Sequence, residues 1–599
     1  MHMKKNLFLV LLAICSTIAI NINLSTNIPL KDSFGIESDI LLINFILYIM
    51  LYKRSFNIKN KRLIIVASIL AIIIALSQII GYNIDNYYTI KSIGTTHETV
   101  IKSVIKFIGL AIIFESIFVV IFNKIESYKV KEDNSENLKF LNSRKMFFIY
   151  FLLIVICYTP YFLHYYPGIC SNDSLYELIK AKWSMGNLVN HHPVFHIFII
   201  HICEKIGNIF GNSDEYGVAV YSIMQLIFTS FVFSYTLRYL TIKKVNKYII
   251  LGIMMFFILY VPFGIYSVTM WKDVPFALFM LLWLIELYEL VTNEKYLNNK
   301  KQIIKFLTIA IMVILFRNNG IYVVTITLMT SIFAMIGKRK KMLFCTIFII
   351  VFYLLYKGPI FKVLNIKDGP KKEALSIPIQ QIARTVKYNG DKLTDEECWR
   401  IDSYLPYDEI GDAYYELISD PVKEMFKEDN FEKDKIGFVK IWGKLLIKYP
   451  GEYIDSFLCG CFGYWYPQEN NWVIATWDNN YETPRYKYER VPIVKIDTID
   501  YVSSMINNRK IPLISNLWNV GLVFIVIFVC MGYVIYKKQY RLIMIYIPII
   551  ALWLTTIASP VWCEYRYVYS AFTTLPMTTL VAIHITNKNS REKIERIKI

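Results

Sequence analysis

Charged and amide side chains gather where apolar segments end, and the first such place follows Pro167 and Gly168. Asn172, Asp173 and Ser174 stand there, before the polar stretch LYELIKAKW. A carboxylate at this position has the chemistry of a general base, or of a metal ligand, facing a substrate at a membrane surface. The structural alternative is helix capping, because side chains of these three types satisfy free N–H groups where a helix begins.

A second place is the turn Trp271-Lys272-Asp273, which lies between two apolar segments. Tryptophan favours the level of the lipid headgroups and lysine extends its ammonium group toward it, so membrane anchoring accounts for the first two residues. A carboxylate at the start of the next helix complements the helix dipole. Anchoring and a functional role for Lys272 and Asp273 therefore both remain open.

Two arginines occupy similar positions, Arg317 in ILFRNNG and Arg566 in WCEYRYVYS. A guanidinium group binds phosphate oxygens in a bidentate manner, which favours arginine where a phosphate must be held. Simple contact with lipid headgroups is the alternative for each arginine. Glu564 is predicted to be the ion-pair partner of Arg566, with a role as a second acid as the alternative.

Four histidines lie within residues 191–201, and His192 and His196 are four residues apart. This spacing places two imidazoles on one helix face, as in some zinc sites, but no acid stands between them in the H-E-x-x-H arrangement. The pattern favours hydrogen bonds between helices over a zinc site.

Aromatic residues concentrate in residues 461–490, among them Trp465, Trp472 and Trp477. Aromatic faces next to hydrogen-bonding side chains suit the rings of sugars. The alternative is an aromatic layer where a domain meets the bilayer, or an ordinary core.

These residues require a membrane framework to position them. The chain has 599 residues, 55% of them hydrophobic, and the apolar residues fall in blocks of a length that crosses about 30 Å of hydrocarbon. Backbone groups in lipid must bond internally, so the blocks predict helices. About fourteen spans are expected, at 6–22, 39–53, 62–80, 104–122, 146–163, 217–238, 248–266, 274–292, 303–317, 320–336, 342–356, 515–535, 541–558 and 569–586.

The formal net charge of +18 resides in basic clusters that fall at every second loop. The positive-inside rule produces this alternation, so the charge indicates topology and argues against nucleic-acid binding. Both termini are then cytoplasmic, and the segment 6–22 is expected to be an uncleaved anchor. The ten cysteines show no zinc-type pairing.

The sequence divides into four regions. Residues 1–145 form an N-terminal extension of four helices, and residues 146–356 form a membrane module whose loop 164–216 lies outside. Residues 357–513 are too long and too polar for a structureless loop and predict a small, mainly helical extracytoplasmic domain. Residues 514–599 return to the membrane and end in a basic cytoplasmic tail. The fold class is an all-α polytopic membrane protein.

The elements P-G-x-x-x-x-D-S (167–174), His192-Pro193 and Trp271-Lys272-Asp273 resemble those of a group of uncharacterised bacterial multi-pass membrane proteins. Their order and sidedness resemble the GT-C fold of integral membrane glycosyltransferases, over about residues 146–586. His192-Pro193 is similar to the helix-opening element of protein O-mannosyltransferases and lipid A aminoarabinose transferases. A second proline commonly follows in those families, where this chain has Val194.

The resemblance implies an enzyme of the cell membrane that moves a sugar from a polyprenyl-phosphate carrier to an envelope polymer, lipid or protein outside the cell. Asp173 would be the base, while Lys272, Arg317 and Arg566 would hold the donor phosphate. Asp273 would orient the phosphate or assist a metal, because some members use a divalent cation such as Mg²⁺ or Mn²⁺, for which Asp173 is the candidate ligand. His192, Trp465, Trp472 and Trp477 would contact sugar or acceptor.

Two other functions fit the same setting. A polysaccharide polymerase or ligase would share the arginines and the external domain without requiring Asp173. A flippase for lipid-linked oligosaccharides, or another transporter, would show polar residues at mid-membrane depth or internal repeats.

Overall fold

The computed structural model describes residues 2–33, 38–128, 144–183, 185–211, 213–467, 473–474, 480–483, 486–508, 514–558 and 561–586. Helices dominate these residues, and the strands among them form only two pairs. Six helical stretches are long and apolar enough to cross a membrane: α3, α4, α6, α9, α12 and the continuous stretch 336–363. The chain is therefore an all-α protein of the membrane.

Each of the fourteen predicted segments overlaps a helix of the structure. Several of these helices are short, among them α10 (Lys247–Leu259), α14 (Gly320–Ala334), α25 (Val520–Tyr536) and α26 (Ile547–Ala558). Proline explains some of the interruptions, since α10 is followed by Pro262 at the start of α11 (Val261–Tyr266). Fourteen crossings thus remain a prediction.

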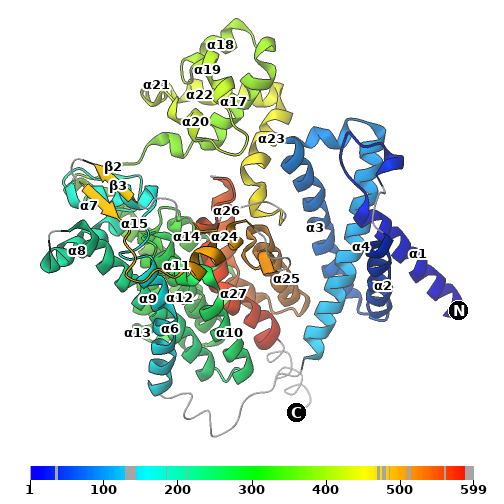
Figure 1. Cartoon of the computed structure of the whole chain (residues 1–599), viewed down its shortest axis with the longest axis horizontal. Helices are drawn as coiled ribbons and strands as arrows, with labels where there is room; N and C mark the ends of the chain where they lie inside the picture. Colours follow the sequence, from blue (N-terminus) through cyan, green and yellow to red (C-terminus); the bar gives the residue numbers. More distant parts are fainter. Residues whose placement is uncertain are drawn as a thin grey trace.

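The N-terminal helices form a separate group at one side of the molecule (Figure 1). They are α1 (His2–Asn21), α2 (Ser38–Ser55), α3 (Lys61–Tyr87) and α4 (His97–Ser127). Asn60 caps α3, and Thr96 with Thr99 forms a capping box on α4, so the sequence fixes where both helices begin. Helix α3 also packs against α25, which joins the group to the rest of the chain.

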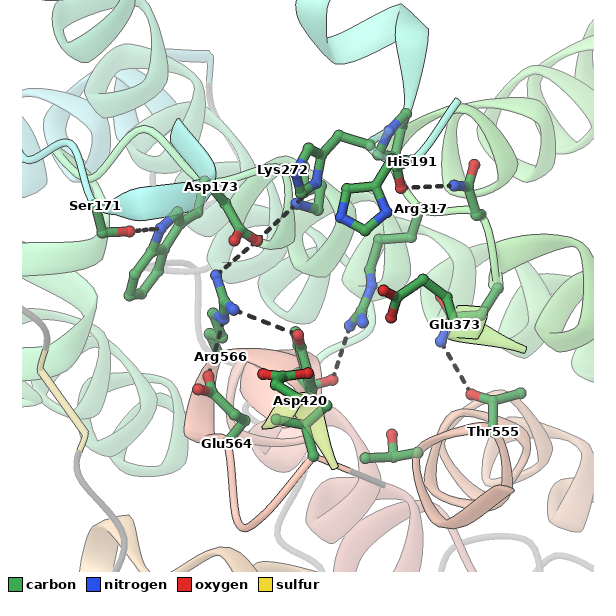
Figure 2. A pocket seen from close by; sticks show the side chains of 18 of the residues that line it. Ser171, Asp173, His191, Lys272, Arg317, Glu373, Asp420, Thr555, Glu564 and Arg566 are labelled. Carbon is green, nitrogen blue, oxygen red and sulfur yellow. Dashed lines mark hydrogen bonds and ion pairs between the residues drawn. The ribbon is translucent and has the colours of Figure 1, made fainter. Parts of the chain in front are cut away.

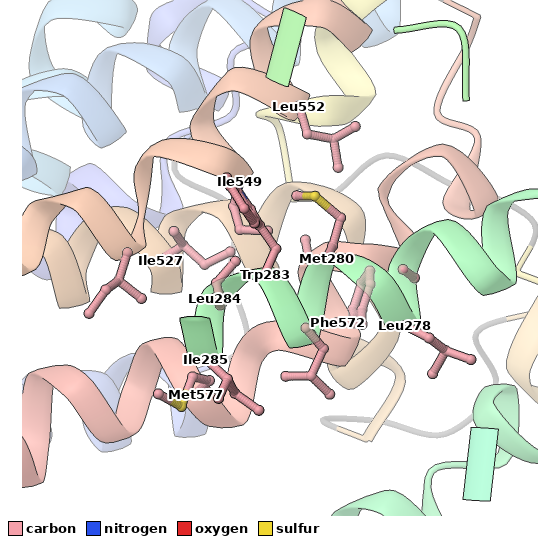
Figure 3. Packing of buried hydrophobic residues seen from close by; sticks show 14 of the residues in the cluster. Leu278, Met280, Trp283, Leu284, Ile285, Ile527, Ile549, Leu552, Phe572 and Met577 are labelled. Carbon is pink, nitrogen blue, oxygen red and sulfur yellow. The ribbon is translucent and has the colours of Figure 1, made fainter. Parts of the chain in front are cut away.

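Helix α12 (Asp273–Thr292) is the centre of the membrane module. Fifteen of its 20 residues are buried, because its sequence is apolar on every side. Figure 3 shows Leu278, Met280 and Leu284 of α12 packed among side chains of α25, α26 and α27 (Tyr569–Leu580). Helices α9 (Asp214–Ile242) and α13 (Lys300–Phe316) also pack against α12, while α6 (Arg144–His164) packs against α9 and α15 (Arg339–Leu355) packs against α14.

The predicted loop 164–216 is itself mostly helical. It contains α7 (Asn172–Trp183), the strand β1 (Val189–Asn190) and α8 (Val194–Phe210). Strand β1 pairs in parallel with β2 (Lys367–Asp368), which follows α15 and the short α16 (Phe361–Val363). The pairing of Val189 with Lys367 therefore holds the loop against the start of the polar segment 357–513.

A compact group of helices has a core of its own and lies at the top of Figure 1. Ile379, Ile382, Leu405 and Leu445 are among its buried residues. The helices are α17 (Ser376–Asn389), α18 (Asp395–Asp402), α19 (Tyr407–Ala413), α20 (Asp420–Glu424), α21 (Glu428–Lys433), α22 (Lys435–Lys448) and α23 (Pro450–Cys461). We call residues 371–461 the helical cap.

The predicted domain 357–513 divides after Cys461. Tyr464, Ile474 and Ile506 join the core of the membrane module, together with α24 (Asp497–Asn507). The hairpin of β3 (Asn480–Thr483) and β4 (Tyr486–Glu489) places Tyr488 in a cluster with residues of α7 and α8. The second half of the segment thus packs on the membrane helices.

A parallel bridge between Ile169 and Thr269 ties the loop after α6 to the turn before α12. Ile169 donates to the carbonyl of Val268 (2.9 Å), and Met270 donates to the carbonyl of Ile169 (2.9 Å). Gly168 precedes this bridge with φ of +152°, a conformation that favours glycine, and a Cβ there would lie 2.0 Å from Oγ of Ser222. The bridge fixes Asp173 and Lys272 relative to each other.

We expect Gly168→Ala to lower the stability of the purified protein by about 1–3 kcal/mol, because backbone strain and steric overlap both oppose the alanine. Thermal unfolding in detergent measures the effect. Gly186→Ala is the matched control, since a Cβ at Gly186 meets no atom within 4 Å. Equal melting temperatures for the two variants would contradict this account of the bridge.

Candidate functional site

A cavity of about 600 Å³ lies where the helical cap meets the ends of the membrane helices (Figure 2). Residues from distant parts of the chain line it: Ser171, Asp173, His191, His192, Pro193, Trp271, Lys272, Arg317, Asn318, Asn319, Thr555, Thr556, Val561, Glu564, Arg566, Tyr567 and, from the cap, Glu373, Asp420, Lys423 and Glu424. Asp173, Lys272, Arg317 and Arg566, which the sequence marked separately, all line this cavity. The convergence of these four side chains on one cavity defines the candidate site.

Asp173 connects two cations. Its Oδ2 accepts from Nζ of Lys272 at 3.1 Å and from Nη1 of Arg566 at 2.9 Å. The residue lies in the first turn of α7, and its side chain is 25% exposed. Burial opposes its charge, but Lys272 and Arg566 overcome this and hold the pKa of Asp173 far below its usual range. Its carboxylate thus faces the cavity and is ionised.

Lys272 is almost fully enclosed by polar partners. Besides Asp173, its Nζ donates to Oε1 of Glu177 at 3.2 Å and to Nδ1 of His192 at 2.9 Å. Burial disfavours the ammonium charge, yet Glu177 and Asp173 raise the pKa of Lys272 above its ordinary value. Burial and Lys272 lower the pKa of His192 to about 4, so His192 is neutral and accepts the hydrogen bond.

Arg317 is held by a carboxylate behind it. Its Nη1 lies 3.0 Å from Oδ1 of Asp273 and donates to the carbonyl of Tyr567 at 3.1 Å. The guanidinium also lies over the rings of Phe276 and Tyr567, at 5.5 and 4.8 Å from their centroids. Asp273 is 1% exposed and is not part of the cavity lining, so its structural effect is to orient Arg317.

Arg566 forms the ion pair with Glu564 that the sequence predicted, at 2.8 Å from Nε to Oε2. Its guanidinium lies between the rings of Trp271 and Tyr567, with centroids 5.2 and 4.9 Å away. Burial raises the pKa of Glu564 to about 7, although Arg566 opposes the shift. Two of the carboxyl groups that line the cavity therefore differ: Asp173 is firmly ionised, and Glu564 titrates near neutrality.

Trp271 is 2% exposed and donates to Oγ of Ser171 at 2.5 Å. Anchoring at the lipid headgroups therefore does not explain this tryptophan. Its bond to Ser171 is a second link between the turn before α12 and the start of α7.

The two histidines have different environments, and only His196 forms hydrogen bonds between helices. His196, in α8, bonds Glu177 through Nδ1 and the hydroxyl of Tyr221 through Nε2 (2.7 Å). His192 precedes α8 and belongs to the cavity instead. Among the described residues, no group of three or more His, Cys, Asp or Glu side chains is arranged to hold a metal ion. Since Asp173 is surrounded by cations, its setting does not fit the predicted Mg²⁺ or Mn²⁺.

Of the three predicted tryptophans, the structure describes Trp465, which does not line this cavity. Trp465 is half-buried beside Cys459 and Phe462, and Trp472 and Trp477 lie outside the described residues. Aromatic faces toward the cavity come instead from Trp271 and Tyr567.

Sequence reasoning missed Glu177 and the residues of the helical cap. Glu177 lies four residues after Asp173 on α7, and this spacing is a signal that could have revealed it. The cap contributes Lys423, which pairs with Glu373 (2.8 Å) and Asp420 (2.7 Å). No local pattern marks these residues, because only the tertiary fold brings them over the cavity.

The pKa of Glu564 predicts a pH dependence. Because the folded state raises this pKa from 4.5 to about 7, its contribution to stability is fully present below about pH 4.5 and is lost as the pH rises through 7. We expect the stability of the wild type, relative to Glu564→Gln, to fall by about 1 kcal/mol or more between pH 5 and pH 8. Thermal unfolding of both proteins across this range measures the difference; a constant difference would show that Glu564 titrates normally.

No curated protein and no solved structure matches the chain. One family model matches residues 181–596, a stretch that includes Lys272, Asp273, Arg317, Glu564 and Arg566 and begins after Asp173. Because the match covers more than half of the sequence, the chain belongs to a family of unknown function, DUF6020.

Proposed function

We propose that the protein is a membrane glycosyltransferase that moves a sugar from a polyprenyl-phosphate donor to an acceptor on the outer side of the membrane. The observation that carries this proposal is the convergence of Asp173, Lys272, Arg317 and Arg566 on one cavity. The cavity opens at the ends of apolar helices, where a lipid-linked phosphate is expected to lie. The GT-C resemblance supplies the reaction class.

The distribution of basic residues indicates which side of the membrane the cavity faces. Helix α12 begins beside the cavity, and the basic residues 338–341 lie at its other end, where Lys338 donates to the carbonyl of Leu290 (3.1 Å). Basic loops favour the cytoplasmic side, so we place the cavity outside and both termini inside.

Lys272, Arg317 and Arg566 are the cations that we assign to the donor phosphate, and all three already contact carboxylates. A phosphate that enters must compete with Asp173 for Arg566 and Lys272. Arginine is suited to this exchange because its planar donors bind two phosphate oxygens at once. Lys272 stays in place during the exchange, since Glu177 still holds it (3.2 Å).

This competition gives Asp173 its role. While two cations bind it, the carboxylate is a weak base. When the donor phosphate attracts those cations, Asp173 becomes free to accept a proton. The acceptor hydroxyl oxygen then bonds to the anomeric carbon, the bond from that carbon to the phosphate oxygen breaks, and the hydroxyl proton passes to Asp173. The leaving polyprenyl phosphate takes the bonding electrons and stays with the arginines.

Glu564 is a second carboxyl group that can take the proton. It lines the same cavity, and its pKa of about 7 suits proton transfer at neutral pH. The test therefore compares variants of both Asp173 and Glu564.

Asp173→Asn is expected to reduce sugar transfer by about 100-fold or more while donor binding persists, because general-base catalysis contributes roughly that much. Purified enzyme, assayed with a panel of polyprenyl-phosphate sugars, provides the measurement. Asp429→Asn, which changes an exposed acid of the cap, is the control. Full transfer by Asp173→Asn together with loss in Glu564→Gln would move the base to Glu564. Full transfer by both variants would exclude Asp173 and Glu564 as the base.

Arg566→Gln is expected to weaken donor binding by about tenfold or more, with a smaller change in the rate of the bound complex, since charge-assisted hydrogen bonds to phosphate contribute about 1.5–3 kcal/mol each. Arg317 needs a paired design, because removing it alone leaves Asp273 buried without its partner. The double variant Arg317→Gln with Asp273→Asn removes both charges.

Equilibrium binding of a polyprenyl-phosphate sugar measures both predictions. Arg400→Gln is the matched control, because Arg400 pairs with Asp434 on the cap, outside the cavity lining. Donor affinities that match the control in both variants would exclude the phosphate clamp.

A further inference from the structure

A second cavity, of about 810 Å³, lies at the opposite ends of the helices that build the first one. It is lined by Val291, Glu294, Asn298, 335–341 and Arg541. Helix α12 runs from Asp273, behind Arg317, to this second cavity, and α14 runs from Asn319 in the same direction. Twenty residues of α12 span about 30 Å, the thickness of the hydrocarbon layer. The two cavities therefore lie at opposite faces of the apolar region.

Cations dominate the lining of this second cavity. Five basic residues line it, whereas Glu294 is the one acid in the lining: the basic residues are Lys338, Arg339, Lys340, Lys341 and Arg541. They come from two places in the chain, the start of α15 and the segment Tyr540–Ile545. The cavity is more than a run of exposed basic residues in the sequence. Arg541 is distant from residues 338–341 in the sequence, and the fold brings it beside them.

Two of the cations have a structural task. Lys338 donates to the carbonyls of Leu290 (3.1 Å) and Asn293 (2.9 Å), at the end of α12. Lys341 donates to the carbonyl of Leu297 (3.1 Å) and to Oδ1 of Asn298 (2.5 Å). These contacts close the C-terminal end of α12 and fix the shape of the cavity.

The other three cations are exposed at the cavity. Arg339, Lys340 and Arg541 form no ion pair with any residue that the structure describes, and they lie around one hollow. Guanidinium and ammonium groups in this arrangement suit an anion with several oxygens, such as a phosphate.

Apolar side chains next to the cations distinguish a lipid from a free anion. Ile336, which lines the cavity, is 67% exposed, and Phe333, one turn earlier in the chain, is 74% exposed. Leu343 and Phe344 of α15 are also exposed, just after the basic residues. The cavity therefore adjoins an apolar surface, along which the acyl chains of a lipid can lie while its headgroup occupies the cavity; a free anion makes no such contact.

We propose that this second cavity binds the phosphate headgroup of an anionic membrane lipid, at the face of the membrane opposite the candidate active site. Arg339, Lys340 and Arg541 bind the phosphate, and the acyl chains lie along Phe333 and Ile336. The proposal is independent of the reaction at the first cavity.

Lipid binding to the full-length protein, purified in neutral detergent, tests the proposal. Native mass spectrometry measures the affinities of phosphatidylglycerol and phosphatidylcholine with the same acyl chains, with inorganic phosphate as competitor. We expect phosphatidylglycerol to bind on the order of tenfold more tightly, and an equal concentration of inorganic phosphate not to displace it. Equal affinities for the two lipids would overturn the proposal, and displacement by phosphate would reassign the cavity to a soluble anion.

Substitutions of the basic residues that line the second cavity test whether the lipid binds there. The triple variant Arg339→Gln, Lys340→Gln and Arg541→Gln should lose the preference for phosphatidylglycerol. The matched control is Lys295→Gln, Lys300→Gln and Lys301→Gln, which removes three exposed charges close by but outside the cavity lining and should keep the preference. The charge-conserving variant Arg339→Lys with Arg541→Lys should also retain it. A preference that survives in the first triple variant, or disappears in the control, would place the lipid elsewhere.

Discussion

The structure depends on pairing charges that lie at the ends of apolar helices. A buried ion without a partner is costly, so Asp173, Lys272 and Arg566 are held together, and Arg317 is held by Asp273. These pairs need the loop after α6 and the turn before α12 to stay in register. The bridge at Ile169 and the bond from Trp271 to Ser171 provide that register. The backbone bridge and the ion pairs between residues far apart in the sequence thus stabilise the same arrangement of the loop and the turn.

The pairing also decides which ligands the cavity accepts. Each cation already contacts a carboxylate, so a weakly charged ligand gains little by displacing it. A phosphate, with several oxygens, can bind two cations at once and compensate for the lost ion pairs. The neutral side chain of His192 strengthens this effect, because it accepts from Lys272 without adding charge. This balance of charges therefore supports the proposal that the cavity binds a donor phosphate.

Much of the fold and of the candidate site was predictable from the sequence. The features that were not predicted have physical causes. The apolar blocks identified the helices, and polar residues at their ends identified Asp173, Lys272, Arg317 and Arg566. The end of the helical cap at Cys461 was not predicted, because residues 462–508 keep the polar composition of an external segment while Tyr464 and Ile506 insert into the membrane core. Glu373 and Asp420 escaped notice because their position over the cavity depends on packing between the cap and the helices.

Helix α12 connects the two cavities and also separates them. Its middle, from Leu278 to Leu284, is enclosed by apolar side chains from other helices, as Figure 3 shows. A transporter needs polar groups along the path of its substrate, and this part of α12 offers only the indole N–H of Trp283, which has no hydrogen-bond partner among the residues described. Passage between the cavities would require this core to separate, at the cost of its buried apolar surface. The packing of α12 therefore argues against a substrate path along this helix, in agreement with the reaction that we propose at one face of the membrane.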